Sequence, residues 1–177
     1  MQAPFDTARL RLRPWTSGDL VDVQALLGDP DVMRFSDAGA LDRAACKDWL
    51  GLALAHDPRV CTWAVVERHR HPVIGYLRLS QAGQTAAPTE IELGLRFLPR
   101  VWGRGYAVEA AQAALDRVTG FDGCTRVIAC VDPDNRRSVA VLKKLGMQHL
   151  RDVMLPGYDH PDHVYAKDLA AGMVRIC

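Results

Sequence analysis

The sequence predicts a mixed α/β fold of the α+β kind, with a mostly antiparallel central sheet and helices on both faces. Residues 62–67, 73–79 and 90–97 read as strands that follow one another with only short polar connections, which is typical of an antiparallel meander. After residue 100 the pattern becomes helix, strand, helix and two further strands. A meander followed by a βαβ unit gives a mixed sheet that needs helices on both sides.

The first part of the chain predicts one strand and two helices. Leucine alternates with arginine over residues 9–13, which indicates a half-exposed strand, and Pro14 ends it. A hydroxyl residue at position 16 or 17 then caps a helix that stops at Gly28. Residues 31–39 are expected to form a loop, and a second helix is expected from about residue 42 to residue 56.

The second half of the chain predicts two helices and three strands. An alanine-rich helix covers residues 103–118, and a second helix ends at Gly146. Three further strands are expected, at residues 126–131, 147–154 and 163–169. With the strands of the first half they give a sheet of about seven strands. The alanine-rich helix and the strands beside it form a right-handed crossover. Since no repeat or linker interrupts the pattern, we expect residues 1–177 to form a single domain.

The composition excludes several classes of protein. The chain has 177 residues and a net charge of +1, which provides no bulk attraction to nucleic acid or to an anionic membrane. No apolar stretch is long enough to cross a membrane, and residues 1–12 lack the apolar core of a secretion signal. We therefore expect a cytoplasmic protein that binds neither nucleic acid nor membrane.

The cysteines and histidines do not predict a metal site. The five cysteines are odd in number and no two are spaced as Cys-x-x-Cys, which argues against a disulfide framework and a zinc site. The six histidines form no His-Glu-x-x-His motif. We expect reduced thiols and no metal cofactor.

Residues 100–107, Arg-Val-Trp-Gly-Arg-Gly-Tyr-Ala, lie between a predicted strand and a predicted helix. Two glycines two residues apart allow a tight turn that presents backbone N–H groups, and the helix N-terminus adds its positive dipole end. With the charges of Arg100 and Arg104, this segment can bind a pyrophosphate without a metal. It is not the dinucleotide fingerprint, because residue 108 is valine, nor a Walker loop. The alternative is that Gly103 and Gly105 only make a turn.

Motifs along the whole chain resemble the GNAT superfamily of N-acetyltransferases. The pattern Arg-x-x-Gly-x-Gly at residues 100–105 matches the superfamily's coenzyme A signature. The longer string at residues 102–110 resembles the branch that contains ribosomal-protein N-terminal acetyltransferases, and residues 7–15 with 29–33 resemble the opening of that branch. The pattern Asn-x-x-Ser at residues 135–138, followed by Lys-Leu-Gly-Met, resembles its later coenzyme A motif.

This resemblance implies that acetyl-CoA is the acetyl donor and that the fourth and fifth strands, residues 90–97 and 126–131, splay apart around its pantetheine arm. The backbone near Phe97 and Leu98 would pair with the arm, and Asn135 would hydrogen-bond to it. The pyrophosphate would lie in the loop, where the contacts expected are Arg100, Gly103, Arg104, Gly105, Tyr106 and Ala107. Because family members often dimerise, a homodimer is a further expectation.

The chemistry of acetyl transfer to an amine requires a group that removes the amine proton. Glu92 is the candidate base, because it lies two residues before Gly94 on the strand that should line the opening, on the face opposite Leu93. The alternative is an exposed glutamate of the sheet without a catalytic role. Glu90, on the same face, is the second candidate.

The leaving thiolate requires a proton, and Ser138 is the candidate donor. Many members of the superfamily place a tyrosine seven residues after the motif asparagine, but here that residue is Leu142. Ser138 lies one helical turn after Asn135 on the same face, and in the ribosomal-protein-like branch a serine at this position is thought to protonate the thiolate. The alternatives are a packing or capping role, with a proton from solvent. No cysteine lies on the motif strand or loop, so direct attack in a ternary complex is expected.

These features together predict an N-acetyltransferase that acts on a primary amine, either a protein N-terminus or a small molecule. The acceptor pocket is expected from residues 32–39, the second helix and residues 154–163. Acidic residues there, Asp37, Asp159 and Asp162, together with Tyr158 and His160, could recognise an amine. The alternative is a coenzyme-A-binding sensor or structural domain without turnover, since a fold does not guarantee an activity.

Overall fold

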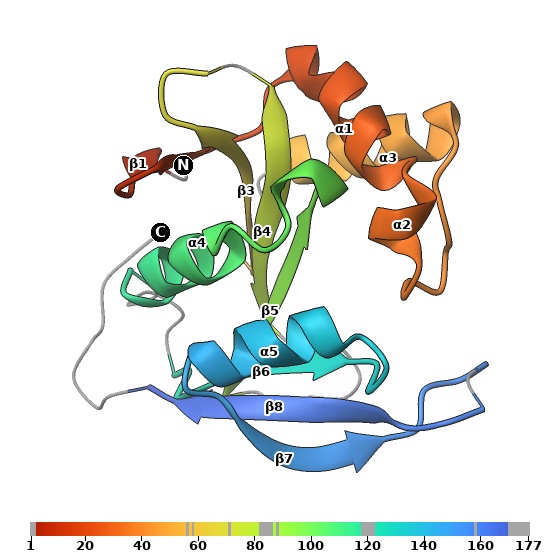
Figure 1. The fold of residues 1–177 in the computed structure, drawn as a ribbon, viewed down its shortest axis with the longest axis vertical. Coiled ribbons are helices and arrows are strands. Elements are labelled where there is room, and N and C mark those ends of the chain that lie inside the picture. The colour runs from red at the N-terminus through yellow and green to blue at the C-terminus, as the bar shows by residue number, and fades with distance from the viewer. Residues whose placement is uncertain are drawn as a thin grey trace.

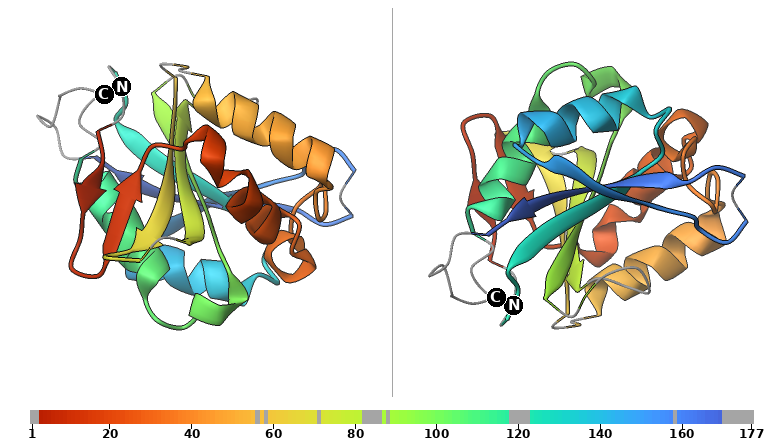
Figure 2. Two further views of the ribbon diagram at one scale, coloured as in Figure 1. Left: turned by 90° about the horizontal axis from the view of Figure 1, so that it is seen from above. Right: turned by 90° about the horizontal axis from the view of Figure 1, so that it is seen from below.

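The structure, a computed structural model, describes residues 3–55, 57, 59–70, 72–81, 87, 89–117, 123–157 and 159–169. These residues form a sheet of eight strands in the order β1-β2-β3-β4-β5-β6-β8-β7. All neighbouring strands are antiparallel except β5 and β6. Helices α1 to α3 lie on one face of the sheet, and α4 and α5 lie on the other (Figures 1 and 2). The predicted mixed fold with helices on both faces is confirmed.

The N-terminal half contains more short elements than the sequence pattern predicts. Its elements are β1 (Phe5–Asp6), β2 (Leu10–Arg13), the 3-10 turn η1 (Ser17–Asp19), α1 (Leu20–Leu27), α2 (Pro30–Met33) and α3 (Arg43–Leu54). The segment predicted as a loop therefore begins inside a short helix. Asp29 caps α2 by accepting hydrogen bonds from the backbone N–H groups of Asp31 and Val32, and Pro30 occupies the first helical position. Strand β1 was not predicted, because two residues show no periodicity.

The remaining elements agree with the predicted order. They are β3 (Val60–Glu67), β4 (Val73–Gln81), β5 (Glu90–Phe97), η2 (Pro99–Val101), α4 (Tyr106–Leu115), β6 (Arg126–Val131), α5 (Arg136–Lys144), β7 (Gln148–Val153) and β8 (Asp162–Asp168). Because of the additional strand β1, the sheet has eight strands among the described residues instead of the expected seven. Within the described residues, no helix combines the length and the apolar character needed to cross a bilayer.

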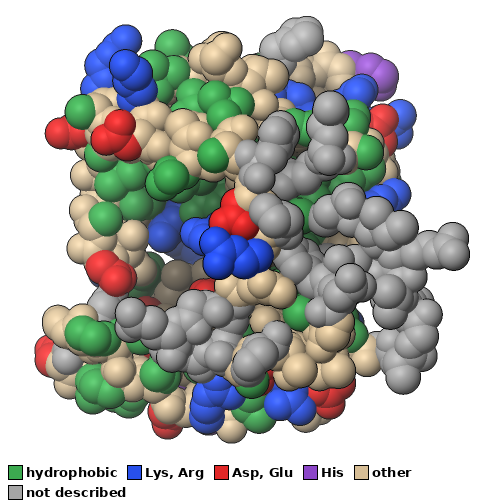
Figure 3. All heavy atoms as spheres, turned by 180° about the vertical axis from the view of Figure 1, so that it is seen from behind, with side chains coloured by type: hydrophobic (Ala, Val, Ile, Leu, Met, Phe, Trp, Pro, Cys, Tyr) green, Lys and Arg blue, Asp and Glu red, His purple; other side chains and the backbone are tan. Residues whose placement is uncertain are grey.

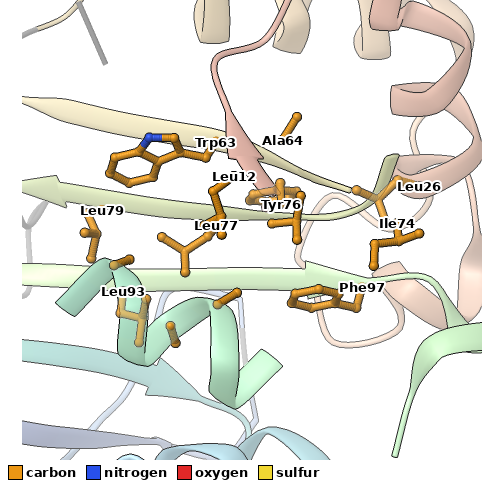
Figure 4. Packing of buried hydrophobic residues seen from close by; sticks show 14 of the residues in the cluster. Leu12, Leu26, Trp63, Ala64, Ile74, Tyr76, Leu77, Leu79, Leu93 and Phe97 are labelled. Atoms are coloured by element: carbon orange, nitrogen blue, oxygen red, sulfur yellow. The ribbon is translucent and has the colours of Figure 1, made fainter. Parts of the chain in front are cut away.

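The hydrophobic core lies on both faces of the sheet, which buries β3 and β4 along most of their length. Leu77 and Leu93 lie beside α4 on one face, whereas Ile74 lies near Leu26 of α1 on the other (Figure 4). A strand covered on both faces loses the strict alternation of exposed and buried residues. Glu90 is accordingly buried rather than exposed.

An ion pair fixes the connection between β2 and α1. The guanidinium of Arg13 donates to Asp19 over 2.7 and 2.8 Å, and Asp19 also accepts from Thr16 in a capping box. Burial alone would raise the pKa of Asp19, but these hydrogen bonds hold it below its ordinary value. The ionised carboxylate therefore sets the direction in which the chain enters the first helix.

The parallel strands β5 and β6 separate after a short paired segment. Their register contains only Glu90 with Arg126, Ile91 with Val127, and Glu92 with Ile128. Strand β5 continues to Phe97 along β4, and β6 continues to Val131 along β8. The expected splay between these two strands is therefore present and begins directly after Glu92.

Candidate active site

The backbone of β5 presents unpaired positions to the opening between β5 and β6. Leu98 N–H donates to the carbonyl oxygen of Ile74 over 2.9 Å. Because hydrogen-bonded pairs alternate along antiparallel strands, Leu95 and Phe97 direct their backbone groups away from β4, toward the opening. Trp102 Nε1 donates to the carbonyl oxygen of Phe97 over 2.6 Å. The amide of Leu98 is thus already bound to β4, and the groups that face the opening belong to Leu95 and to the N–H of Phe97.

The glycine loop that follows β5 has the backbone conformation of an anion-binding turn. Gly103 and Gly105 have φ angles of +75° and +79°, a region that side chains with a Cβ rarely occupy. Gly105 is the N-cap of α4, so the loop leads directly into free amides at the positive end of a helix dipole. A Cβ on Gly103 would meet no atom within 4 Å, which shows that the loop has open space around it.

The same loop is held against the N-terminal strands by polar side chains. Arg9 pairs with Glu109 over 2.7 Å and donates to the carbonyl oxygen of Arg104 over 2.9 Å. Burial alone would raise the pKa of Glu109, but hydrogen bonds from Thr7 and Arg9 keep it below its ordinary value. These contacts join residues about a hundred positions apart, and sequence spacing gave no signal for them.

The side chains predicted to surround the pyrophosphate point in different directions. Arg104 pairs with Glu67 over 3.2 Å, and the Tyr106 hydroxyl donates to the same carboxylate over 2.8 Å. Part of the positive charge of Arg104 is therefore neutralised on the side of β3. Arg100 is exposed on η2, and Ala107 lies half-buried in the first turn of α4. The loop's amides and Arg100 are then the main source of positive potential for an anion.

Helix α5 begins beside this loop. Asn135 caps it, and its Oδ1 accepts a hydrogen bond from the backbone N–H of Ser138 over 3.2 Å. In the described part of the chain this cap engages only the carbonyl oxygen of the Asn135 side chain, so its NH₂ group can donate elsewhere. The guanidinium of Arg137 lies 4.6 Å from the ring centre of Trp102, which connects the start of α5 to the loop.

The two candidate bases have different surroundings. Glu90 is buried and accepts from the backbone of Ala87, and its carboxylate lies 3.7 Å from Arg126 and 3.4 Å from Arg151. Its charge therefore stabilises the paired end of β5 and β6. Glu92 is half-buried at the start of the opening, and burial raises its pKa, an effect that Arg78 partly offsets.

Glu92 lies on the sheet face covered by α1 to α3. Tyr76 and Arg96 mark this face, since the ring of Tyr76 is 5.1 Å from that of Trp49 on α3 and Arg96 donates to the Tyr76 hydroxyl. Alternate residues of a strand share a face, so Glu92 shares it with Arg96. Ser138, half-buried on α5, belongs to the opposite face (Figure 2).

Cys130 follows on β6, within the opening, and is a protonated thiol. Its Sγ donates to Asp162 over 3.5 Å. Burial, followed by the charges of Asp162 and Glu92, raises the pKa of Cys130 to about 12. A thiol at neutral pH is a poor nucleophile, which agrees with direct transfer to the amine. Leu142, seven residues after Asn135, is buried in the core.

An acidic cluster borders the opening on the Glu92 face. Burial raises the pKa of Asp162, and the carboxylates of Asp132 and Asp37 raise it further. Asp162 Oδ1 is buried without a hydrogen-bond partner among the described residues, and His160 lies 3.7 Å from Asp132. Of the acceptor residues predicted from the sequence, Asp159 is 97% exposed and Tyr158 lies outside the described residues. Asp132 was not among the predicted residues.

Seen from behind, the molecule is hollowed at this place. Figure 3 shows a depression between the upper and lower parts, where hydrophobic, basic and acidic side chains meet. An anion-binding loop, a gap in the sheet, a half-buried carboxylate and an acidic cluster thus follow one another across the molecule. This arrangement suits a phosphorylated thioester on one face and a cationic substrate on the other.

A family model for the acetyltransferase (GNAT) domain matches residues 9–148. The chain belongs to the GNAT acetyltransferase family. It is 30% identical over 150 residues to the uncharacterized protein YkkB of Bacillus subtilis, covering 83% of this chain and 86% of that protein. It is also 26% identical to the uncharacterized N-acetyltransferase YoaA of the same organism over 147 residues, 81% of this chain and 82% of YoaA. The chain is accordingly an N-acetyltransferase by family.

Solved GNAT structures share the fold. An acetyltransferase from Bacillus anthracis superposes with a TM-score of 0.79 at 22% identity, over 94% of this chain and 97% of that chain. The spermidine N-acetyltransferase of Vibrio cholerae, in complex with CoA and spermine, gives a TM-score of 0.74 at 17% identity, over 90% and 95% of the two chains. The aminoglycoside acetyltransferase AAC(6')-Ib, in complex with ribostamycin and coenzyme A, gives 0.75 at 17% identity, over 92% and 94%.

The glycine loop can be tested by substitution. We expect Gly105→Val to remove most of the rise in melting temperature that acetyl-CoA causes, because a left-handed backbone costs valine about 1–3 kcal/mol and the new Cβ would lie 3.5 Å from Nη2 of Arg9, which holds the loop. Gly146, with a φ of +76°, lies at the end of α5. Gly146→Val is therefore a control with similar strain, and it should be destabilised but keep the shift. An equal shift in both variants would contradict the loop assignment.

Proposed function

We propose that this protein transfers the acetyl group of acetyl-CoA to a primary amine by direct attack within a ternary complex. The strongest support is the end of β5–β6 pairing at Glu92, which places a half-buried carboxylate of raised pKa at the opening. On the other face lie the glycine loop and the start of α5, and the gap between the strands connects the two faces. The solved relatives that hold CoA with an amine support this arrangement.

The cofactor path follows the helix N-termini. The pyrophosphate would bind the amides around Gly103 and Gly105, with Arg100 nearby, while the N–H of Phe97 and the backbone of Leu95 would pair with the pantetheine arm. Asn135 would donate its NH₂ group to the arm from the other side. This path brings the thioester to the end of the paired segment, within reach of Glu92.

Chemically, the amine lone pair attacks the thioester carbonyl carbon, a new C–N bond forms and the C–S bond breaks. The amine proton passes to the Glu92 carboxylate, which returns it to solvent. The coenzyme A thiolate takes a proton from the Ser138 hydroxyl, and the hydroxyl regains a proton from solvent in the same step. Burial gives Glu92 a pKa closer to neutrality than that of an exposed glutamate, which makes it a stronger base. A backbone N–H that faces the opening would stabilise the developing oxyanion.

Release of free coenzyme A thiol with a panel of amines separates this function from a coenzyme-A-binding sensor. We expect Glu92→Gln to lower turnover by about 10²-fold or more, with little change in acetyl-CoA affinity. The wild-type rate should rise with pH as Glu92 loses its proton, and the variant should lose that titration. Glu90→Gln is the control, because it removes a buried charge without touching the opening. A wild-type rate and pH profile in Glu92→Gln would assign Glu92 a structural role.

Ser138→Ala tests the proton donor without disturbing the cap of α5, because the backbone N–H of Ser138, and not its hydroxyl, donates to Asn135. If the hydroxyl protonates the thiolate, we expect kcat to fall by about 10²-fold. The KM for acetyl-CoA should change less, since the lost interaction forms mainly in the transition state. A saturated rate within about twofold of wild type across pH would instead indicate protonation by solvent.

We further propose that the acceptor carries a second cationic group beside the reacting amine. Asp132 and Asp162 lie next to the opening, and the buried Asp162 Oδ1, which has no hydrogen-bond partner among the described residues, would gain one from a bound ammonium group. Small polycationic amines have this chemistry, as the spermine and ribostamycin complexes of the structural relatives illustrate. The ribosomal-protein-like motifs favour the alternative acceptor, a protein N-terminus, and the amine panel therefore includes peptides.

Asp132→Asn tests this recognition, because the amide retains the acceptor for the backbone N–H of Asp134 but removes the charge. We expect the KM for a polyamine such as spermidine to rise about tenfold or more, the value of one charge-assisted hydrogen bond. The KM for a monoamine should be unaffected. Asp159→Asn, at the exposed neighbour, is the matched control. Equal effects on monoamines and polyamines, or faster acetylation of peptides than of polyamines, would contradict a polycationic acceptor.

A further inference from the structure

Two histidines and one aspartate converge on strands β7 and β8. His149 Nε2 lies 2.7 Å from Asp152 Oδ1, and His163 Nε2 lies 3.8 Å from the same oxygen. The two imidazole rings have centroids 5.0 Å apart at an angle of 77°, so the edge of one ring faces the plane of the other. The three donor atoms lie within 4.8 Å of one another.

A β-bulge produces this convergence. In a regular strand, residues three positions apart point to opposite faces, which would separate His149 from Asp152. Here His149 is opposite Tyr165 and Asp152 is opposite His163, while the register shifts between them at Leu150. The extra residue brings both side chains to the face of His163. Spacing in the sequence therefore conceals the site, because the histidines and the aspartate do not follow a known ligand motif.

We propose that His149, Asp152 and His163 bind a divalent transition metal ion, with Zn²⁺ the best chemical match. Two imidazole nitrogens and one carboxylate oxygen form a three-ligand set that leaves positions for water. Ligand bonds of about 2.0–2.2 Å place tetrahedral donors about 3.3 Å apart, between the two observed distances. Because all three side chains are at least one-third exposed, small rotations suffice. The ring of Tyr165 packs against that of His149, with centroids 5.8 Å apart, and so restricts the orientation of one of the ligands.

This site is separate from the acidic cluster at the opening. His163 and Asp162 are adjacent on β8 and so point to opposite faces of the sheet. The other three-residue group, Asp132, His160 and Asp162, offers one imidazole and two carboxylates, which suits an ammonium group or a hard cation better than Zn²⁺. Asp132 and His160 therefore provide an internal comparison for a zinc titration.

A bound ion would join the edge strand β7 to β8. Strand β7 is the last in the sheet and pairs only with β8 in the described part of the chain. The hairpin that connects them leads to His160 and Asp162 beside the opening. The ion would therefore stabilise the sheet edge that carries one side of the proposed acceptor pocket, independently of whether acetyl transfer occurs there.

The experiment is a titration of the full chain with ZnCl₂ alone, in competition with a chromophoric chelator at neutral pH, together with melting temperature. We expect one Zn²⁺ per chain and a rise in melting temperature, since an ion that binds only the folded state stabilises it. His149→Ala and His163→Ala should each weaken binding at least tenfold, because each variant removes one ligand. His160→Ala is the matched control and should bind like wild type.

Three results would overturn the site: no zinc binding by the wild-type chain, unchanged binding in both His149→Ala and His163→Ala, or loss of binding in His160→Ala. Retention of the melting shift caused by acetyl-CoA shows that each variant is folded. If a histidine variant lacks that melting shift, the Asp152→Asn variant is tested in its place. Asparagine has nearly the same size as aspartate and keeps one side-chain oxygen, but it lacks the charge of the ligand. Zinc binding by Asp152→Asn equal to that of wild type would likewise overturn the site.

Discussion

The arrest of parallel pairing after Glu92 and Ile128 is the constraint on which the site depends. Each of the two separating strands remains bound to its other neighbour, β5 to β4 as far as Phe97 and β6 to β8 as far as Val131. The gap therefore does not result from a loss of strand structure. It results from the divergence of β5 and β6, each of which stays paired with its other neighbour. Backbone donors and acceptors of the two strands therefore face one another across a space. Polar backbone groups in such a place require partners, and an extended, amide-rich ligand supplies them.

The two helices that follow the separating strands complete the site. Parallel strands end on the same side of a sheet, so α4 and α5 both begin where the gap is widest. Their N-termini add positive potential from two directions, and the contact between Arg137 and Trp102 holds them together. The brace from Arg9 to Glu109 and to the backbone of Arg104 fixes the glycine loop from the opposite side. The loop proposed to bind the pyrophosphate is thus held by contacts outside it, and none of these contacts requires the ligand.

Much of the architecture follows from the sequence, because the meander, the crossover and the glycine loop each have a local pattern. The choice between Glu90 and Glu92 does not, because both lie on one face of the same strand. Only the surroundings distinguish them, since Arg126 and Arg151 neutralise Glu90 from distant strands. Asp132 was missed because its partners, His160 and Asp162, come from beyond the next helix and strand. The bulge at Leu150 likewise changes which residues share a face, and no periodicity in β7 reveals it.

The narrow junction between β5 and β6 also divides the sheet into two leaves of unequal size. Strands β1 to β5 form one leaf and β6, β8 and β7 form the other, with three residue pairs in the seam. Each leaf carries its own helix on the loop side, α4 on the first and α5 on the second. On the proposed path, an arm that pairs with the backbone of β5 and is held by Asn135 at the start of α5 would bridge the two leaves. Binding of the acetyl donor would therefore also couple the two leaves mechanically.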